Sequence, residues 1–137
     1  MKKRNKILVM LLAFAVPFVC VGCSDGGEST SAGSLGYEQI SGAEAKALME
    51  SESGYIIIDA RTQSEYDEGH IPGAILIPEY EIASRAENEL PDKNQLILVY
   101  CRSGRRSKIA AEELVKLGYT NVKEFGGIID WEYEIEK

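Results

Sequence analysis

Histidine is nearly absent from this sequence of 137 residues, which also contains only three cysteines. The single histidine, His70, stands in a turn-like segment, residues 69–73, rich in glycine and proline. One histidine cannot build a metal centre of several imidazole and thiolate ligands, and no cysteine–histidine pair is indicated near the catalytic candidate described below. We therefore expect a structural role for His70, no metal ion and no cofactor.

Basic residues are also few, since 15 Lys and Arg face 22 Asp and Glu. Four of the basic residues lie within the first six positions, so the chain after residue 22 has 11 basic and 22 acidic residues, a net charge of −11. Such a negative field excludes nucleic acid as an expected partner. Residues 93–111, however, contain five basic residues and no acidic one, so positive charge is concentrated there.

The chain lacks an apolar run long enough for a permanent membrane span. Basic residues at positions 2–6 precede an apolar stretch over residues 7–21, which is shorter than the ~20 residues that a transmembrane helix needs and is interrupted by Pro17. A basic start followed by a short apolar stretch is typical of secretion signals. Residues 1–22 are therefore predicted to be a signal peptide.

The segment Cys20-Val21-Gly22-Cys23 resembles the lipobox of bacterial lipoproteins, in which a signal peptidase cuts before a lipidated cysteine. Cys20 departs from that pattern, because the family usually has leucine there, and a plain secreted or retained signal is the alternative. The resemblance implies lipidation of Cys23. The chain would then be extracytoplasmic and anchored to the bacterial cell membrane by lipid alone.

Residues 23–36 contain almost no large apolar side chains, Leu35 being the exception. Such a composition cannot bury enough surface to offset the entropy of ordering, so we expect a flexible tether there and a single folded domain over residues 37–137. With Cys20 removed and Cys23 alkylated, Cys101 is the only remaining thiol. An unpaired thiol in an exported domain is a candidate reactive group.

Within the domain, apolar runs alternate with segments of helical pattern. Capping boxes at residues 41–44 and 62–65 predict two helix starts, and runs rich in β-branched residues predict strands buried on both faces. Alternation of this kind predicts an α/β fold, a small parallel β-sheet flanked by helices on both faces. The expected helices are 41–50, 62–69, 80–90, 107–117 and a short one ending at residue 131, and the expected strands are 55–58, 74–77, 95–100 and 121–125.

Cys101 follows the strand expected over residues 95–100, where open α/β sheets place their sites. Backbone amides between such a strand and the next helix can converge on an anion. Together with the helix dipole they can supply the roughly 2.7 kcal/mol that lowers a thiol pKa by about two pH units. The alternative is a small core residue at a strand end. Packing of a core cysteine does not explain the three arginines beside it, Arg102, Arg105 and Arg106. Their presence therefore favours a functional thiol.

Three segments resemble the rhodanese family of sulfurtransferase domains, and the resemblance spans roughly residues 37–134. These segments are residues 59–74, which read DARTQSEYDEGHIPGA, residues 101–107, which read CRSGRRS, and residues 126–131, which read GGIIDW. The resemblance implies that Cys101 takes sulfane sulfur from a donor such as thiosulfate as a persulfide, and passes it to a thiol or cyanide acceptor.

The resemblance also implies residue roles. Cys101 would be the nucleophile, the loop amides would hold the persulfide, and Arg102, Arg105 and Arg106 would attract the donor. The expected partners are a small anionic sulfur donor and a thiol acceptor, which can be a protein, and we expect a monomer. The substrate-binding set is Arg102, Ser103, Gly104, Arg105 and Arg106, and the supporting set is Asp59, Arg61 and Ser107.

Two alternative functions are weighed against sulfur transfer. Phosphatases and arsenate reductases with a cysteine loop place arginine six residues after the cysteine, where this chain has Ser107, and Arg106 lies at five. The loop is thus one residue short for a phosphate oxyanion. The second alternative is a rhodanese module that binds or senses sulfane sulfur without turnover, although silent modules usually lack the cysteine.

Overall fold

A computed structural model describes residues 36–137, and the predicted signal peptide, the lipidation site Cys23 and nearly all of the predicted tether lie outside the described residues. The domain is built on one five-stranded sheet of order β1-β5-β4-β2-β3, in which all neighbouring strands are parallel. Its strands are β1 Glu38–Gln39, β2 Ile56–Asp59, β3 Ala74–Leu76, β4 Ile97–Cys101 and β5 Val122–Gly127. Its helices are α1 Gly42–Ser51, α2 Gln63–Glu68, α3 Ile82–Glu89 and α4 Arg105–Lys116, with 3₁₀ turns η1 Glu79–Glu81 and η2 Ile128–Asp130.

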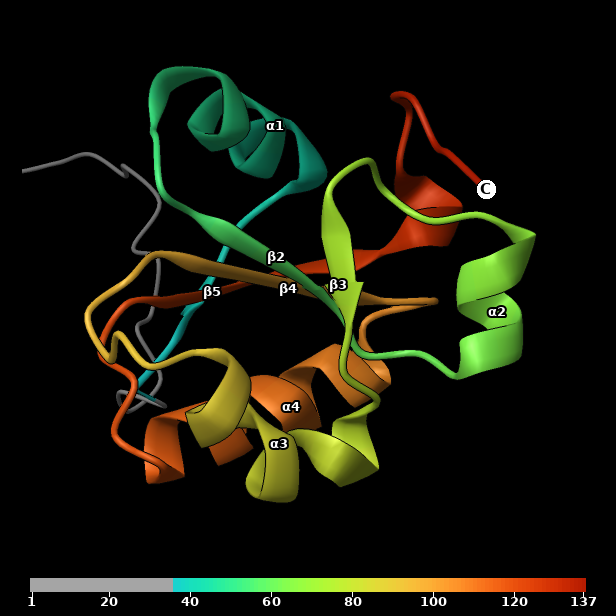
Figure 1. Cartoon of the computed structure of the whole chain (residues 1–137). Helices are drawn as coiled ribbons and strands as arrows, with labels where there is room; N and C mark the ends of the chain where they lie inside the picture. The colour runs from blue at the N-terminus through green and yellow to red at the C-terminus, as the bar shows by residue number, and fades with distance from the viewer. Residues whose placement is uncertain (1–35) are drawn as a thin grey trace, which may run out of the picture. The chain divides into compact units, whose positions relative to one another are not determined.

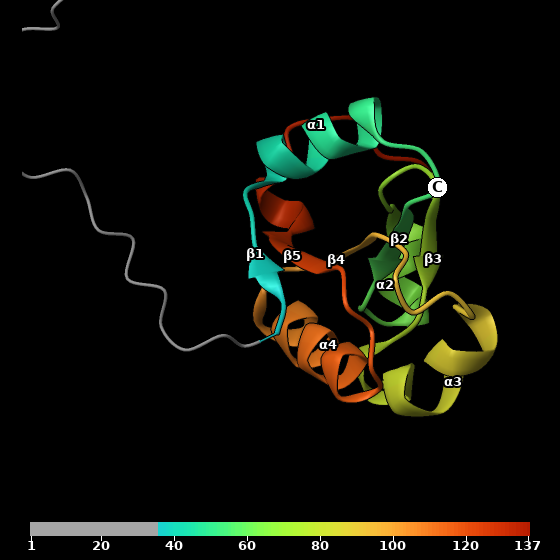
Figure 2. The ribbon, with the colours of Figure 1, turned by 90° about the vertical axis from the view of Figure 1, so that its left-hand side faces the viewer.

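Helices cover both faces of the sheet, as the sequence predicts. Helix α1 lies on one face, helices α3 and α4 lie on the other, and α2 stands beyond the carboxyl ends of the strands (Figure 1). Figure 2 shows the same layers along the strands, with β1 at one edge of the sheet. The predicted α/β fold is confirmed. Among residues 36–137, no helix has the length and apolar character to cross a membrane.

The central strand β4 contributes side chains to two separate cores. Ile97, Val99 and Cys101 belong to the core that includes residues of α3 and α4, whereas Leu98 and Tyr100 belong to the core beneath α1. The alternation follows from the two-residue period of a strand, and all five side chains are buried. Cys101 is therefore directed toward the layer that contains α4.

The structure corrects the expected boundary of α4. The helix begins at Arg105 and not at Ser107, so Arg105 and Arg106 lie in its first turn and not in a loop. Gly104 adopts φ 100°, a left-handed conformation that turns the chain into the helix two residues early. The connection between β4 and α4 is thus only the segment Arg102–Gly104.

Other elements also differ from the sequence prediction. The helix expected over residues 80–90 is divided into η1 and α3, the terminal helix is the single turn η2, and the short edge strand β1 had not been expected. β5 extends to Gly127, two residues beyond the strand expected over residues 121–125. The two capping boxes are confirmed, since Ser41 and Thr62 are the N-caps of α1 and α2.

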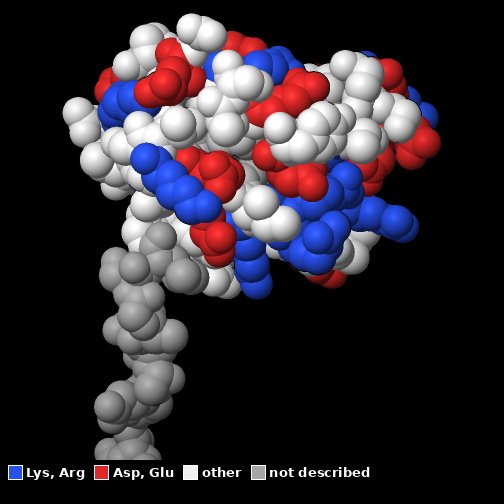
Figure 3. Space-filling model, turned by 90° about the horizontal axis from the view of Figure 1, so that it is seen from below, with Lys and Arg blue, Asp and Glu red and all other residues white. Residues whose placement is uncertain are grey.

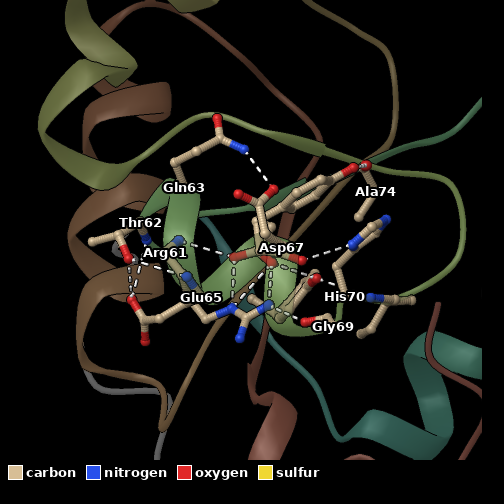
Figure 4. A network of polar contacts seen from close by, with 12 residues as sticks. Arg61, Thr62, Gln63, Glu65, Asp67, Gly69, His70 and Ala74 are labelled. Atoms are coloured by element: carbon tan, nitrogen blue, oxygen red, sulfur yellow. Dashed lines mark hydrogen bonds and ion pairs between the residues drawn. The ribbon is translucent and has the colours of Figure 1, made fainter. Parts of the chain in front are cut away.

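A buried ion pair connects the end of β2 to α2. The Arg61 guanidinium donates to the Asp59 carboxylate through Nε at 3.0 Å and through Nη2 at 2.7 Å, and Nη2 also donates to the Gly69 carbonyl at 2.7 Å. Figure 4 shows Arg61 reaching toward Gly69 at the end of α2. Tyr100 on β4 donates its hydroxyl to Asp59 at 2.7 Å and accepts the Ile71 amide at 3.1 Å. Every charge in this cluster is therefore compensated.

His70 is used structurally, consistent with the expectation for it. Its ring stacks on Tyr66 with centroids 3.7 Å apart, and Nδ1 lies 2.9 Å from the Tyr66 carbonyl oxygen. Its backbone forms a two-hydrogen-bond bridge with Glu136, which holds the C-terminal segment. Trp131 of this segment packs against Phe125, with ring centroids 5.7 Å apart.

We predict that Tyr100→Phe lowers the free energy of unfolding by about 2 kcal/mol, because it removes a donor from the buried Asp59 carboxylate and leaves the Ile71 amide unpaired. Chemical denaturation measures this change. Tyr80→Phe is the matched control, since Tyr80 is 67% exposed. Equal stability of Tyr100→Phe and the wild type would contradict the role assigned to this hydroxyl.

Candidate active site

Cys101 ends β4, and its sulfur lies at the floor of the turn that leads into α4. The residue is only 1% exposed and belongs to the core on the α4 side of the sheet. Burial alone would make it an inert core thiol. The Gly104 amide, however, donates to the Cys101 Sγ atom at 3.0 Å. The sulfur is thus buried within reach of backbone donors.

Several donors of this turn are arranged to favour the thiolate. Burial raises the pKa of the Cys101 thiol, but hydrogen-bond donors of Ser107, Gly104 and Ser103, their backbone amides among them, outweigh it, so the pKa lies below its ordinary value. No side chain caps α4, which leaves its first amides available to the sulfur. The anion is stabilised by backbone donors and by the helix terminus, without a histidine or a metal.

The turn rests directly on the end of β5. Between Val99 and Cys101 the register of β4 against β5 shifts, Val99 facing Glu124 and Cys101 facing Gly127, with Gly126 at φ 85° in between. A Cβ atom at Gly127 would lie 2.0 Å from the Arg102 carbonyl oxygen. Only glycine therefore fits at position 127. The same carbonyl accepts the Ile129 amide at 3.2 Å, which holds the turn against η2.

The three arginines next to Cys101 have different environments. Arg102 and Arg105 are exposed, and neither forms an ion pair within the described part of the chain. Arg106 is half-buried and donates through two nitrogens to Glu65, at 2.7 and 2.8 Å. Arg106 was expected to attract the sulfur donor, but its guanidinium is bound to Glu65. Of the three arginines, Arg102 and Arg105 are the ones exposed to solvent.

Figure 3 shows basic atoms in several places on the face seen from below, with the largest group right of centre and acidic atoms between the groups. Arg105 and Lys108, near the start of α4, are exposed. A positive patch on a protein of net charge −7 attracts small anions to one place on its surface.

The predicted supporting residues lie behind the turn and not at its mouth. Ser107 is buried, and its Oγ contacts the Gly104 carbonyl at 3.0 Å and Glu124 Oε1 at 2.6 Å. Asp59 and Arg61 hydrogen-bond one another, Tyr100 and Gly69, and they stabilise the neighbouring strand end. Among residues 36–137, no group of three potential ligands is close enough to hold a metal ion.

Three residues of this region were not singled out as site residues from the sequence. Glu65 was noted only as a capping residue, yet it also holds Arg106. Gly127 was part of a family-like segment, but its close approach to Arg102 could not be read from spacing. Glu124 is 2% exposed, and the only available signal was an acidic residue within a predicted strand.

We predict that Glu65→Gln lowers the stability of the protein at neutral pH by about 2 kcal/mol. Hydrogen bonds from Arg106, aided by Thr62 against the opposing effect of burial, lower the pKa of Glu65 to about 2. An unfolded glutamate titrates near ~4.3, so the stabilisation is present above that pH and is lost as the pH falls toward 2. Denaturation at several pH values measures it.

The difference between wild type and Glu65→Gln should therefore shrink between about pH 4.5 and 2. Glu87→Gln is the control, because Glu87 pairs with Lys93 at an exposed position, with 60% of its side chain accessible. A Glu65→Gln effect no larger than that of Glu87→Gln would show that the Arg106 pair contributes no more than a surface ion pair.

Comparison with known proteins places this chain among rhodanese-like domains. The family model of the rhodanese-like domain matches residues 41–134. The chain is 44% identical over 73 residues to thiosulfate sulfurtransferase PspE of Escherichia coli K12, which covers 53% of this chain and 70% of the relative. An E. coli rhodanese solved with anions superposes with a TM-score of 0.58 at 40% identity, covering 61% of this chain and 98% of that one.

A solution structure of a rhodanese-like domain from Anabaena superposes with a TM-score of 0.67 at 30% identity, covering 72% of this chain and 77% of that one. The resemblance noted in three segments of the sequence is thus matched over a range that includes strands β2 to β5. The family match over residues 41–134 includes both Cys101 and the Gly127 on which its turn rests. The chain belongs to the rhodanese family.

Proposed function

We propose that this protein is a sulfurtransferase that carries sulfane sulfur as a persulfide on Cys101. The observation that carries the proposal is the 3.0 Å hydrogen bond from the Gly104 amide to Sγ at the uncapped start of α4. The lowered pKa of the Cys101 thiol supports the same role, since the thiolate is the nucleophile. The E. coli relative named thiosulfate sulfurtransferase supports thiosulfate as one donor.

The reaction takes place in two steps, each a displacement at sulfur. The Cys101 thiolate attacks the outer sulfur of thiosulfate, the S–S bond of the donor breaks, and sulfite leaves with the electron pair. An acceptor thiolate or cyanide then attacks the outer sulfur of the persulfide and restores the Cys101 thiolate. No electrons are gained or lost overall, so the reaction needs no cofactor. Covalent catalysis of this kind gives ping-pong kinetics.

Charge at the mouth of the turn suits an anionic donor. Arg102 and Arg105 are exposed beside the sulfur, and neither is engaged in an ion pair within residues 36–137. They attract the donor, and the amides of Ser103, Gly104 and Ser107 stabilise negative charge on sulfur. The proposed acceptor is a small thiol or a protein thiol.

A phosphatase is disfavoured by the size of the turn. Only Arg102, Ser103 and Gly104 separate β4 from α4, and the arginine that a phosphatase of this type needs six residues after the cysteine is replaced by Ser107. Arg106, one residue earlier, is bound to Glu65. The chain thus offers no spare guanidinium in the position of a phosphate-binding arginine.

We predict that the purified protein forms thiocyanate from thiosulfate and cyanide, and that Cys101→Ser abolishes this activity. Serine preserves the size of the side chain but cannot form a persulfide. Colorimetric detection of thiocyanate measures the reaction, and mass spectrometry of the wild type after thiosulfate should show ~32 Da added to the Cys101 peptide. The matched control is Ser84→Ala, at an exposed position of α3.

Equal thiocyanate formation by the wild type and Cys101→Ser would exclude Cys101 as the nucleophile. Absence of activity together with a stable persulfide on Cys101 would favour a module that binds or senses sulfur. Hydrolysis of phosphate esters by the wild type, lost in Cys101→Ser, would favour the phosphatase alternative.

The proposed location is the outer face of the bacterial cell membrane, with Cys23 as the lipidated first residue of the mature chain. We predict that intact-mass analysis of the membrane-extracted protein shows diacylated Cys23 and that Cys23→Ser removes the lipid. Cys20→Leu is the control, because it restores the usual lipobox leucine and should leave lipidation in place. An unmodified Cys23 in the membrane-extracted wild type would contradict the anchor.

A further inference from the structure

Glu124 is an acidic side chain enclosed beneath the cysteine turn. It lies on β5 and is only 2% exposed, although it has no basic partner within the described residues. A Cβ atom built on Gly104 would lie 3.8 Å from Glu124 Oε1, so the carboxylate lies directly behind the turn. Burial of an acid without a cation is costly. The proposed sulfur transfer assigns it no role.

The Glu124 carboxylate is satisfied by neutral donors. Oε1 accepts the Gly126 amide at 2.8 Å and the Ser107 hydroxyl at 2.6 Å. The second distance is in the range of a hydrogen bond from a hydroxyl to a charged oxygen, which is about twice as strong as a neutral one. The other oxygens near Ser107 Oγ are the carbonyls of Gly104 and Gly126, which lie farther away, at 3.0 and 3.4 Å.

A serine hydroxyl has a single proton to donate. The Ser107 hydroxyl also faces Cys101, where it would lower the thiol pKa if it donated to the sulfur. It cannot donate to the sulfur and to Glu124 at the same time. The short distance to Oε1 indicates that the Ser107 hydroxyl donates its proton to the Glu124 carboxylate and not to the sulfur.

We propose that Glu124 is a positioning residue for Cys101, which takes the proton of the Ser107 hydroxyl and so withholds that donor from the sulfur. The thiolate is then stabilised by the backbone amides alone, with a carboxylate behind the turn opposing it. The consequence for turnover rests on the proposed function. A thiolate with too low a pKa is a weak nucleophile, and attack is fastest when the pKa is near the ambient pH.

Other charged groups around the turn come from separate elements. Arg106 at the start of α4 is close enough to interact with the charge of Cys101, and it is also influenced by Glu65 of α2 and Glu79 of η1. Tyr37, which precedes β1, is influenced by Glu124. Arg106 keeps these neighbours when residue 124 is substituted, and among these groups only Tyr37 loses the influence of Glu124. Removal of the carboxylate thus isolates its own effect on the sulfur.

A double-mutant cycle of Glu124→Gln and Ser107→Ala tests the proposal in the full chain. Iodoacetamide labelling of Cys101 at a series of pH values, followed by mass spectrometry of its peptide, measures the thiol pKa without sulfur transfer. Glu124→Gln should lower this pKa by about one pH unit, because it removes the opposing charge and replaces the charged acceptor of the Ser107 hydroxyl by a weaker, neutral one. Ser107→Ala should shift it by less than half a unit in the wild type, but raise it clearly in Glu124→Gln.

Glu112→Gln is the matched control, since it removes the same charge from an exposed position of α4 and should leave the labelling profile unchanged. An unchanged or raised Cys101 pKa in Glu124→Gln would overturn the proposal. So would a large rise in Ser107→Ala alone, a variant that answers the question even if Glu124→Gln fails to fold. A protein that shows this cycle but forms no thiocyanate would retain the inference and lose the proposed function.

Discussion

The close contact between the cysteine turn and β5 is the constraint on which the site depends. The Arg102 carbonyl lies where a side chain at position 127 would be. The turn can therefore take this position only because residue 127 is a glycine. The register shift between β4 and β5 brings Gly127 opposite Cys101. With the turn held there, the Gly104 amide points at the sulfur. A packing relation between two strands thereby determines the reactivity of one thiol.

Two ion pairs keep the surrounding elements in place without competing for the sulfur. Arg61 forms hydrogen bonds with Asp59 and with the carbonyl of Gly69 at the end of α2. Arg106 forms hydrogen bonds with Glu65 in the first turn of the same helix. Both are forked guanidinium contacts, which fix orientation as well as distance. The arginines that remain exposed, Arg102 and Arg105, are close to Cys101 in the sequence. The arginines that stabilise the fold are therefore different residues from the exposed arginines that a small anion can reach.

The electrostatics of the turn is a balance of opposing influences. Burial raises the pKa of the Cys101 thiol, while neighbouring donors lower it. Glu124 adds negative charge behind the turn and holds the Ser107 hydroxyl at 2.6 Å. A reactive thiol must also serve as the leaving group when its persulfide is discharged, which favours an intermediate pKa over the lowest attainable one. The position of Glu124 beneath the turn is consistent with a Cys101 thiol pKa that is lowered only in part.

Local patterns in the sequence predicted most of the elements and singled out Cys101 as the candidate thiol. Capping boxes and β-branched runs predicted the alternating fold, and three short motif segments carried the resemblance to the family, because these signals act over a few residues. The start of α4 was misplaced because it depends on the left-handed Gly104. The pairing of Arg106 with Glu65, the fit of Gly127 under Arg102, and the contact of Glu124 with Ser107 join residues 17 to 41 positions apart. Only the tertiary structure decided them, since such contacts arise from strand register and packing between layers.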